Sequence, residues 1–161
     1  MAVVSRRAVI AGLGVICIAG AGFLGIGGTT LYYSAITEPY AGSALTAPEA
    51  FAMAQSGAIT LIDIRRPDEW TATGSPMGAH RLDLRRTDFS EALAVLVKGQ
   101  RNAPVAVICA RGVRSAKVAN RLHNAGFTAV SDVPEGMMGS AAGPGWLSRG
   151  LPLDRTPVST P

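Results

Sequence analysis

Cysteine and histidine are both scarce in this chain of 161 residues, which contains two of each. Cys17 falls within an apolar segment far from Cys109, so we expect no structural disulfide. Neither His80 nor His123 has a second histidine or cysteine at metal-ligand spacing, so no metal site and no cofactor is predicted. A strong excess of charge is also lacking. Apart from two arginines near its start, the chain has 13 basic and 11 acidic residues, a balance that argues against nucleic-acid binding.

The longest apolar segment runs from Ala8 to Gly28, 21 residues without a charge. This length is sufficient to span a bilayer, and a buried core helix of that kind would be unusual. The preceding Ser5-Arg6-Arg7 resembles the start of a twin-arginine export signal, with a valine-isoleucine pair in place of the usual phenylalanine-leucine. We predict that residues 1–33 are a signal or membrane anchor, and we favour an uncleaved anchor. The rest of the chain would face the periplasm, either anchored in the inner membrane or exported.

A domain boundary is predicted near Thr46. Residues 34–45 combine Pro39 and Gly42 with few apolar side chains, which is typical of a linker. Thr46 and Glu49 have the spacing of a capping box, which predicts that a helix begins there. We therefore predict one domain over residues 46–155, followed by a short tail at 156–161.

Hydrophobic runs and helix signals alternate within the predicted domain. Strands are expected at Ile59 to Ile64, Arg81 to Leu84, Val105 to Ile108 and Phe127 to Val130. Helices are expected after Thr46, after Asp88 or Ser90, and from about Arg114 to a stop at Gly126. This alternation predicts an α/β fold with a mostly parallel central sheet flanked by helices, preceded by the N-terminal hydrophobic helix.

The most informative stretch follows the strand expected at residues 105–108. Cys109 lies at its carboxyl end, where open α/β sheets usually place their chemistry. Gly112 allows the chain to curl, and a curled loop before a helix directs several backbone N–H groups toward one point. The helix N-terminus and the charges of Arg111 and Arg114 add positive potential. These surroundings favour the thiolate form of Cys109, which is the reactive form.

The spacing Cys-x-x-Gly-x-Arg-Ser, from Cys109 to Ser115, resembles the active-site loop of the rhodanese family of sulfurtransferases. In that family a six-residue loop opens on the nucleophilic cysteine, and here it would end at Arg114. Protein tyrosine phosphatases carry five residues between cysteine and arginine, which would require an arginine where this chain has Ser115. The shorter loop suits a single sulfane sulfur better than a phosphoryl group.

Two further segments resemble the same family. Asp63, Arg65 and Glu69 match its first signature. We interpret them as fold-forming: a carboxylate at a strand end, and an ion pair between Arg65 and Glu69 that orders the following helix. The second segment runs from Pro134 to Met137 and continues with Trp146 and with Gly150 to Leu153. It departs from the family pattern in two ways, because Glu135 replaces a glycine and residues 140–145 are extra. The extra residues are expected where the family builds a wall of the active-site pocket.

The resemblance implies a sulfurtransferase. Cys109 would take sulfur from a small donor such as thiosulfate or a persulfide, hold it as a persulfide, and release it to an acceptor thiol or cyanide. Arg114 would hold the loop and its anion, while Arg111 would attract the donor at the mouth. The remaining loop residues, Ala110, Gly112, Val113 and Ser115, would contribute backbone N–H groups to the substrate.

Two alternatives remain open from the sequence. One is a phosphatase or arsenate-reductase activity on the same fold, which Cys109-dependent hydrolysis of an aryl phosphate would reveal. The other is a non-catalytic or slow module that binds or delivers sulfur to a periplasmic partner protein, which would turn over small donors poorly.

Overall fold

The computed structural model describes residues 31–157. Almost all of the segment predicted as a signal or anchor, residues 1–33, therefore lies outside the described residues, as does the end of the predicted tail. Within residues 31–157 no helix has both the length and the apolar character needed to cross a bilayer. Residues 31–36 are helical and lead into the domain.

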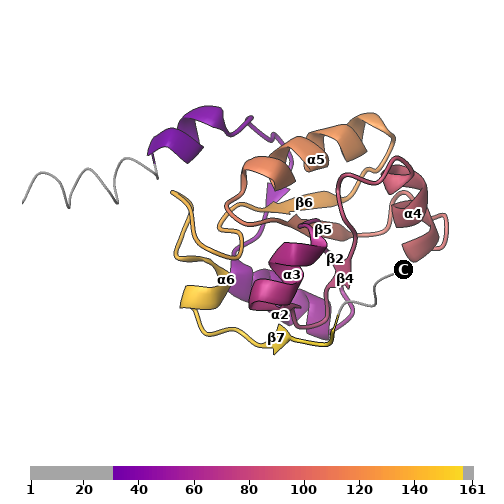
Figure 1. Cartoon of the computed structure of the whole chain (residues 1–161). Helices are drawn as coiled ribbons and strands as arrows, with labels where there is room; N and C mark the ends of the chain where they lie inside the picture. The colour runs from indigo at the N-terminus through magenta and orange to yellow at the C-terminus, as the bar shows by residue number, and fades with distance from the viewer. Residues whose placement is uncertain (1–30, 158–161) are drawn as a thin grey trace, which may run out of the picture.

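Helices and strands alternate along the described chain (Figure 1). In order they are β1 (Ser43–Ala44), α2 (Ala47–Gln55), β2 (Thr60–Asp63), α3 (Pro67–Thr73), β3 (Ser75–Pro76), β4 (His80–Arg81), α4 (Phe89–Leu96), β5 (Val105–Ile108), α5 (Val113–Asn124), β6 (Val130–Val133), α6 (Gly145–Ser148) and β7 (Leu153–Asp154). A five-stranded sheet has the order β1-β6-β5-β2-β4, and all its strand pairs are parallel. The expected parallel α/β fold is confirmed, with a small antiparallel pair, β3 and β7, added beside it.

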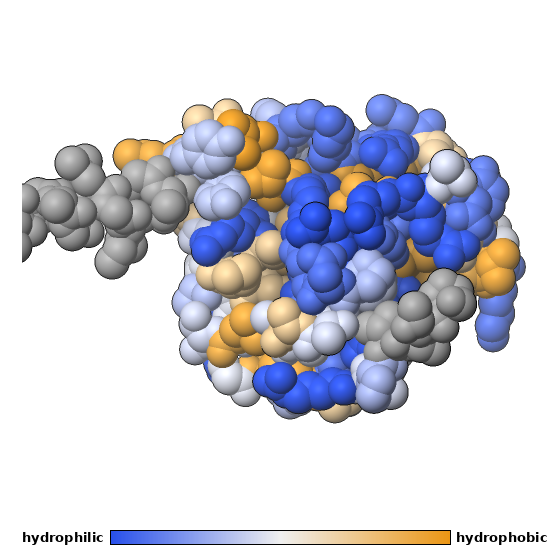
Figure 2. Space-filling model, in the orientation of Figure 1, coloured by the Kyte–Doolittle hydropathy of each residue, from blue (hydrophilic) through white to orange (hydrophobic). Residues whose placement is uncertain are grey.

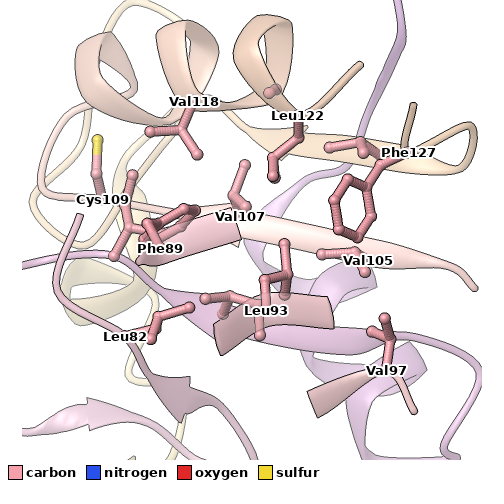
Figure 3. Close-up of a cluster of buried hydrophobic side chains, with 14 residues drawn as sticks. Leu82, Phe89, Leu93, Val97, Val105, Val107, Cys109, Val118, Leu122 and Phe127 are labelled. Atoms are coloured by element: carbon pink, nitrogen blue, oxygen red, sulfur yellow. The ribbon is translucent and has the colours of Figure 1, made fainter. Parts of the chain in front are cut away.

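The sheet divides the hydrophobic core into two layers, and β5 is its middle strand. Its side chains alternate, as the pleat of a strand requires, so that Val105, Val107 and Cys109 join the layer beneath α4 and α5. Ala106 and Ile108 point to the opposite layer, which α2 and α6 cover. Figure 3 shows Cys109 at one end of the first layer, with its sulfur directed away from the apolar side chains.

The capping box at the start of α2 is confirmed. Thr46 Oγ1 accepts from the backbone N–H of Glu49, and the Glu49 carboxylate accepts from the backbone N–H of Thr46. The helix after the Cys109 loop begins at Val113, and the chain turns at Gly126, where the sequence predicted the stop. Local signals of this kind are reliable because they involve neighbours in the sequence.

The expected bounds of two strands are wrong. The last large strand, β6, covers Val130–Val133 rather than residues 127–130, because Phe127 is fully buried beneath α5 as part of the turn into the strand. The segment predicted as a linker, residues 34–45, contributes β1, which pairs with β6. Within it Tyr40 packs against the core and donates its hydroxyl to the Val130 carbonyl at 2.8 Å. The expected edge strand is also shorter, and β4 ends at Arg81.

Candidate active site

The loop that follows β5 is held closely against a second loop, the one after β6. Gly112 has φ 84°, and a side chain there would meet the Pro134 carbonyl oxygen at 2.4 Å. Gly136 has φ 64°, and its added Cβ would lie 2.5 Å from the Ala110 carbonyl oxygen. The backbone N–H of Met137 also donates to the Cys109 carbonyl at 2.9 Å. Only glycine permits this approach of two backbones, so the packing fixes the path of the loop around Cys109.

The six residues after Cys109, Ala110 to Ser115, each carry a backbone N–H group. None of these six groups donates to another backbone group within residues 31–157. The first N–H that does so is that of Ala116, which donates to the Gly112 carbonyl at 3.0 Å. Three of the six belong to the first turn of α5, where N–H groups have no partner within the helix. The loop and helix start therefore present unused donors, as an anion-binding site requires.

Cys109 itself is a free thiol and is 1% exposed. Its Sγ lies 3.5 Å from the hydroxyl oxygen of Ser115, which is also fully buried and donates to the Gly112 carbonyl at 3.0 Å. A small donor therefore reaches the sulfur only through local opening of the loop or of the wall beside it. The side chain of Ser115 therefore contacts the sulfur, a contact that the sequence analysis did not predict.

Arg114 is held in place by Glu69 of α3. Its Nη1 and Nη2 donate to the two Glu69 oxygens at 2.7 and 2.6 Å. Burial of Glu69 opposes its ionisation, but the hydrogen bonds from Arg114 and from the Arg66 N–H outweigh it and lower the pKa of Glu69 to about 2. The same hydrogen bond raises the pKa of Arg114, and the nearby Cys109 adds to that rise. A fixed cation thus stands close to the cysteine.

The expected ion pair between Arg65 and Glu69 is wrong in its partner. Arg65 is 2% exposed and binds the fully buried Asp63, with Nε and Nη2 donating to the carboxylate at 2.9 and 2.7 Å. Ser75 donates to the same carboxylate at 2.7 Å, and Arg65 also donates to the Gly74 carbonyl. This buried network ties the end of β2 to the segment after α3, whereas Glu69 binds Arg114 at the end of the Cys109 loop.

Arg111 lies on the other side of the loop, near the N-terminal helix. Its Nη1 donates to the Gly139 carbonyl at 3.3 Å, and its guanidinium carbon stands 5.2 Å from the centre of the Tyr33 ring. The side chain is partly exposed, as a residue at the mouth would be. The segment before the predicted domain therefore contacts the loop, an arrangement that no local pattern in the sequence indicated.

The departures near the C-terminus form one local structure. Glu135 is 1% exposed and accepts from the N–H groups that open α2 and α6, those of Ala47 and Gly145. It also binds Arg149 through two hydrogen bonds, at 2.7 and 3.0 Å. The extra residues form a tight turn, with Ser140 and Gly143 paired, beside Arg111 and Gly112. Residues 31–157 contain no group of three or more His, Cys, Asp or Glu placed to hold a metal ion.

Sequence reasoning missed Asp132. This residue of β6 is 4% exposed, and burial is the main cause that raises its pKa to about 6. Its Oδ1 has no hydrogen-bond partner in the described part of the chain. The signal was an acid within an apolar strand, but it was obscured because the strand was predicted three residues too early.

A cysteine at the end of a central parallel strand, a loop of unused N–H groups and a fixed arginine lie together here, an arrangement suited to chemistry at a cysteine. The rhodanese-like domain family matches residues 46–142, and the chain belongs to this family. No curated protein matches the sequence.

Solved structures give the same result. The polysulfide-sulfur transferase homodimer of Wolinella succinogenes is 27% identical, with a TM-score of 0.52, over 85% of this chain and 90% of that one. A thiosulfate sulfurtransferase from Pseudomonas aeruginosa is 25% identical, with a TM-score of 0.54, over 70% of this chain and 20% of that one. A rhodanese-related protein from Thermoplasma volcanium, 24% identical with a TM-score of 0.52 over 71% and 99%, shares the fold. Family and neighbours together support sulfur transfer in general.

Proposed function

We propose that this protein transfers sulfane sulfur through a persulfide on Cys109. The observation that carries the proposal is the set of six unused N–H groups, from Ala110 to Ser115, that directly follows the cysteine. A thiolate or persulfide at Sγ is an anion, and preorganised N–H donors stabilise an anion most effectively where water is excluded. Cys109 is 1% exposed, so its surroundings meet that condition.

The proposed reaction has two half-reactions. In the first, the Cys109 thiolate attacks the outer sulfur of a donor, the donor's S–S bond breaks, and the leaving group departs with the bonding electrons; with thiosulfate that group is sulfite. In the second, an acceptor thiolate attacks the outer sulfur of the Cys109 persulfide and restores the thiolate. An acceptor cyanide would leave as thiocyanate. The sulfur atom passes from the donor to the acceptor without any external oxidant or reductant.

Donor chemistry follows from the charges beside the cysteine. Arg114 is fixed by Glu69 and supplies a stationary positive charge near Sγ, while Arg111 stands at the mouth. Both would favour anionic donors, of which thiosulfate and polysulfide are examples, and polysulfide is the donor named for the Wolinella succinogenes neighbour. Removing the positive charge of either arginine should slow the first half-reaction on the order of a hundredfold.

Intact mass and turnover of the full chain test the proposal together. After incubation with thiosulfate or polysulfide, the native protein should gain the mass of one sulfur atom and lose it again when a thiol is added. Cys109→Ser should do neither, and Cys17→Ser, the matched control that removes the other cysteine, should behave as the native protein does. A folded protein that never gains sulfur would refute the proposal; gain without multiple turnovers would favour a dedicated sulfur carrier.

We further propose that residues 1–33 tether the domain to the inner membrane, facing the periplasm. The apolar run of the sequence supports this, together with Leu31, Tyr32 and Ile36, which are 72%, 61% and 44% exposed in the helical segment 31–36. Figure 2 shows apolar side chains on this helix at the point where the chain enters the domain. Retention in membranes washed with alkaline carbonate, with digestion by protease added from the periplasmic side, tests the tether; release by carbonate would refute it.

A further inference from the structure

A cavity of about 420 Å³ lies beside the Cys109 loop, between the N-terminal segment, the start of α5 and the extra turn at residues 140–142. Its lining is mainly apolar, with Pro39, Ala44, Ala116, Pro134, Ala141 and Ala142. Cys109 is not among the lining residues, whereas Arg111 and Gly112 are. The cavity is therefore distinct from the sulfur position, although both share the loop.

Three of the hydroxyl groups that line this cavity, those of Thr37, Tyr40 and Ser140, donate their hydrogens to backbone carbonyls. Tyr40 donates to a backbone carbonyl at 2.8 Å, Thr37 does so at 2.6 Å, and Ser140 does so at 2.7 Å. The cation in the lining, Arg111, is engaged with the Gly139 carbonyl and the Tyr33 ring. What these groups leave for a ligand is mostly acceptor capacity, which selects a molecule that brings donors.

Asp132 provides the strongest of those acceptors. It is 4% exposed and lines the cavity, and its Oδ1 has no partner among residues 31–157. A buried carboxylate oxygen without a donor is costly, so such a group requires a partner that the protein itself does not supply here. Glu38, a second carboxylate of the lining, lies 3.9 Å from Lys117 across an exposed and therefore weak pair.

We infer that this cavity binds a small organic ammonium compound, whose N–H group donates to Asp132 and whose apolar body packs against the prolines and alanines of the lining. This site goes beyond sulfur transfer and does not depend on it. An ammonium group supplies both the missing donor and the opposite charge, whereas a neutral alcohol supplies a weaker donor alone. An anionic ligand would meet two carboxylates, Asp132 and Glu38, and one cation, Arg111, which is already engaged with the Gly139 carbonyl and the Tyr33 ring.

The test is ligand-observed fluorine NMR on the full chain at pH 7.5, with 4-fluorobenzylamine as the probe and 4-fluorobenzyl alcohol as its neutral counterpart. The amine should bind about tenfold or more tightly than the alcohol, because hydrogen bonds to charged groups are the strong ones. Asp132→Asn, which keeps the size of the side chain, should abolish that preference. Asp88→Asn, at an exposed carboxylate of the α4 start, is the matched control and should retain it.

Ala142→Phe provides a second test that leaves Asp132 intact. Ala142 is exposed at the cavity wall, so a larger side chain there should block entry of both probes without disturbing the core. Equal affinity for amine and alcohol, or an amine affinity within twofold of native in Asp132→Asn, would overturn the inference. So would undiminished binding in Ala142→Phe or the absence of amine binding to a native protein that still melts cooperatively. Persulfide formation on Cys109 of the native protein is measured separately, so failure of this inference and failure of the proposed function are distinguishable.

Discussion

Glu69→Gln removes the charge that fixes Arg114 while keeping the shape of the side chain. The native pair joins both nitrogens of Arg114 to both oxygens of Glu69, at 2.7 and 2.6 Å, with the two side chains 31% and 20% exposed. In the variant one carboxylate oxygen becomes an amide NH2, which cannot accept from the guanidinium. We expect Arg114 to lose one of its two anchoring bonds and the charge opposite it.

The pKa of Glu69, about 2 against a usual 4.5, sets the upper limit of the loss. One pKa unit corresponds to 1.36 kcal/mol, so the shift from 4.5 to about 2 amounts to at most about 3.4 kcal/mol of unfolding free energy. Solvent screening at this partly exposed pair reduces the expected loss to about 1 to 2 kcal/mol. Persulfide formation should slow as well, though by less than in Arg114→Ala, because the guanidinium is still present.

Urea unfolding at several pH values measures this loss. The folded-state pKa of Glu69 is depressed, so its contribution is fully present above pH 4.5 and is lost as the pH falls from 4.5 toward 2. The difference between native and Glu69→Gln should therefore be largest at pH 6 and shrink at pH 3. Glu91→Gln, at an exposed position of α4, should show little difference at either pH. A loss that does not change with pH would refute the ion-pair explanation.

Two other substitutions have matched controls within the chain. Gly112→Ala should destabilise the protein by about 2 kcal/mol or more and disturb the loop, because the new Cβ would meet a backbone oxygen at 2.4 Å. Gly57→Ala, where φ is a similar 74° but the space is open, should cost only about 1 kcal/mol of conformational strain. Urea unfolding compares the two variants, and equal losses of unfolding free energy would contradict the packing argument. Asp63→Asn should lower the unfolding free energy by about 3 to 5 kcal/mol, because it leaves the buried Arg65 charge uncompensated. Asp83→Asn, at a more exposed pair with Arg85, should lower it by less than about 1 kcal/mol. Thermal and urea unfolding measure both losses, and similar losses at the two sites would count against a buried network at Asp63.

The parts of the site that could be predicted from the sequence are those encoded by neighbouring residues. Cys109, Gly112 and Arg114 lie within six positions of one another, and the apolar strand before them is equally local. The capping box of Thr46 and Glu49 is confirmed for the same reason. Such patterns determine backbone conformation directly, so they remain valid whatever the rest of the chain does.

Partners that are distant in sequence could not be predicted in this way. Glu69 and Arg114 are 45 positions apart, and only the packing of α3 against the loop brings them together. A nearer arginine, Arg65, was the natural local choice, but the pleat of β2 and the turn after it direct Arg65 inward to Asp63. Asp132 was missed because a polar pair, Ser131 and Asp132, interrupts the apolar pattern of β6.

Glu135 stands where the rhodanese family usually has the first of two adjacent glycines. The structure shows that the Cys109 loop requires glycine at position 136 and not at position 135. Gly136 has φ 64° and stands against the Ala110 carbonyl oxygen, so a side chain there is excluded by both strain and contact. Position 135 has no positive φ, and its side chain points away, to the starts of α2 and α6 and to Arg149. A buried carboxylate with four hydrogen bonds is well satisfied. Glu135 therefore changes the contacts of the segment that carries the extra residues 140–145. The close contact of Gly136 with Ala110, which fixes the Cys109 loop, is kept.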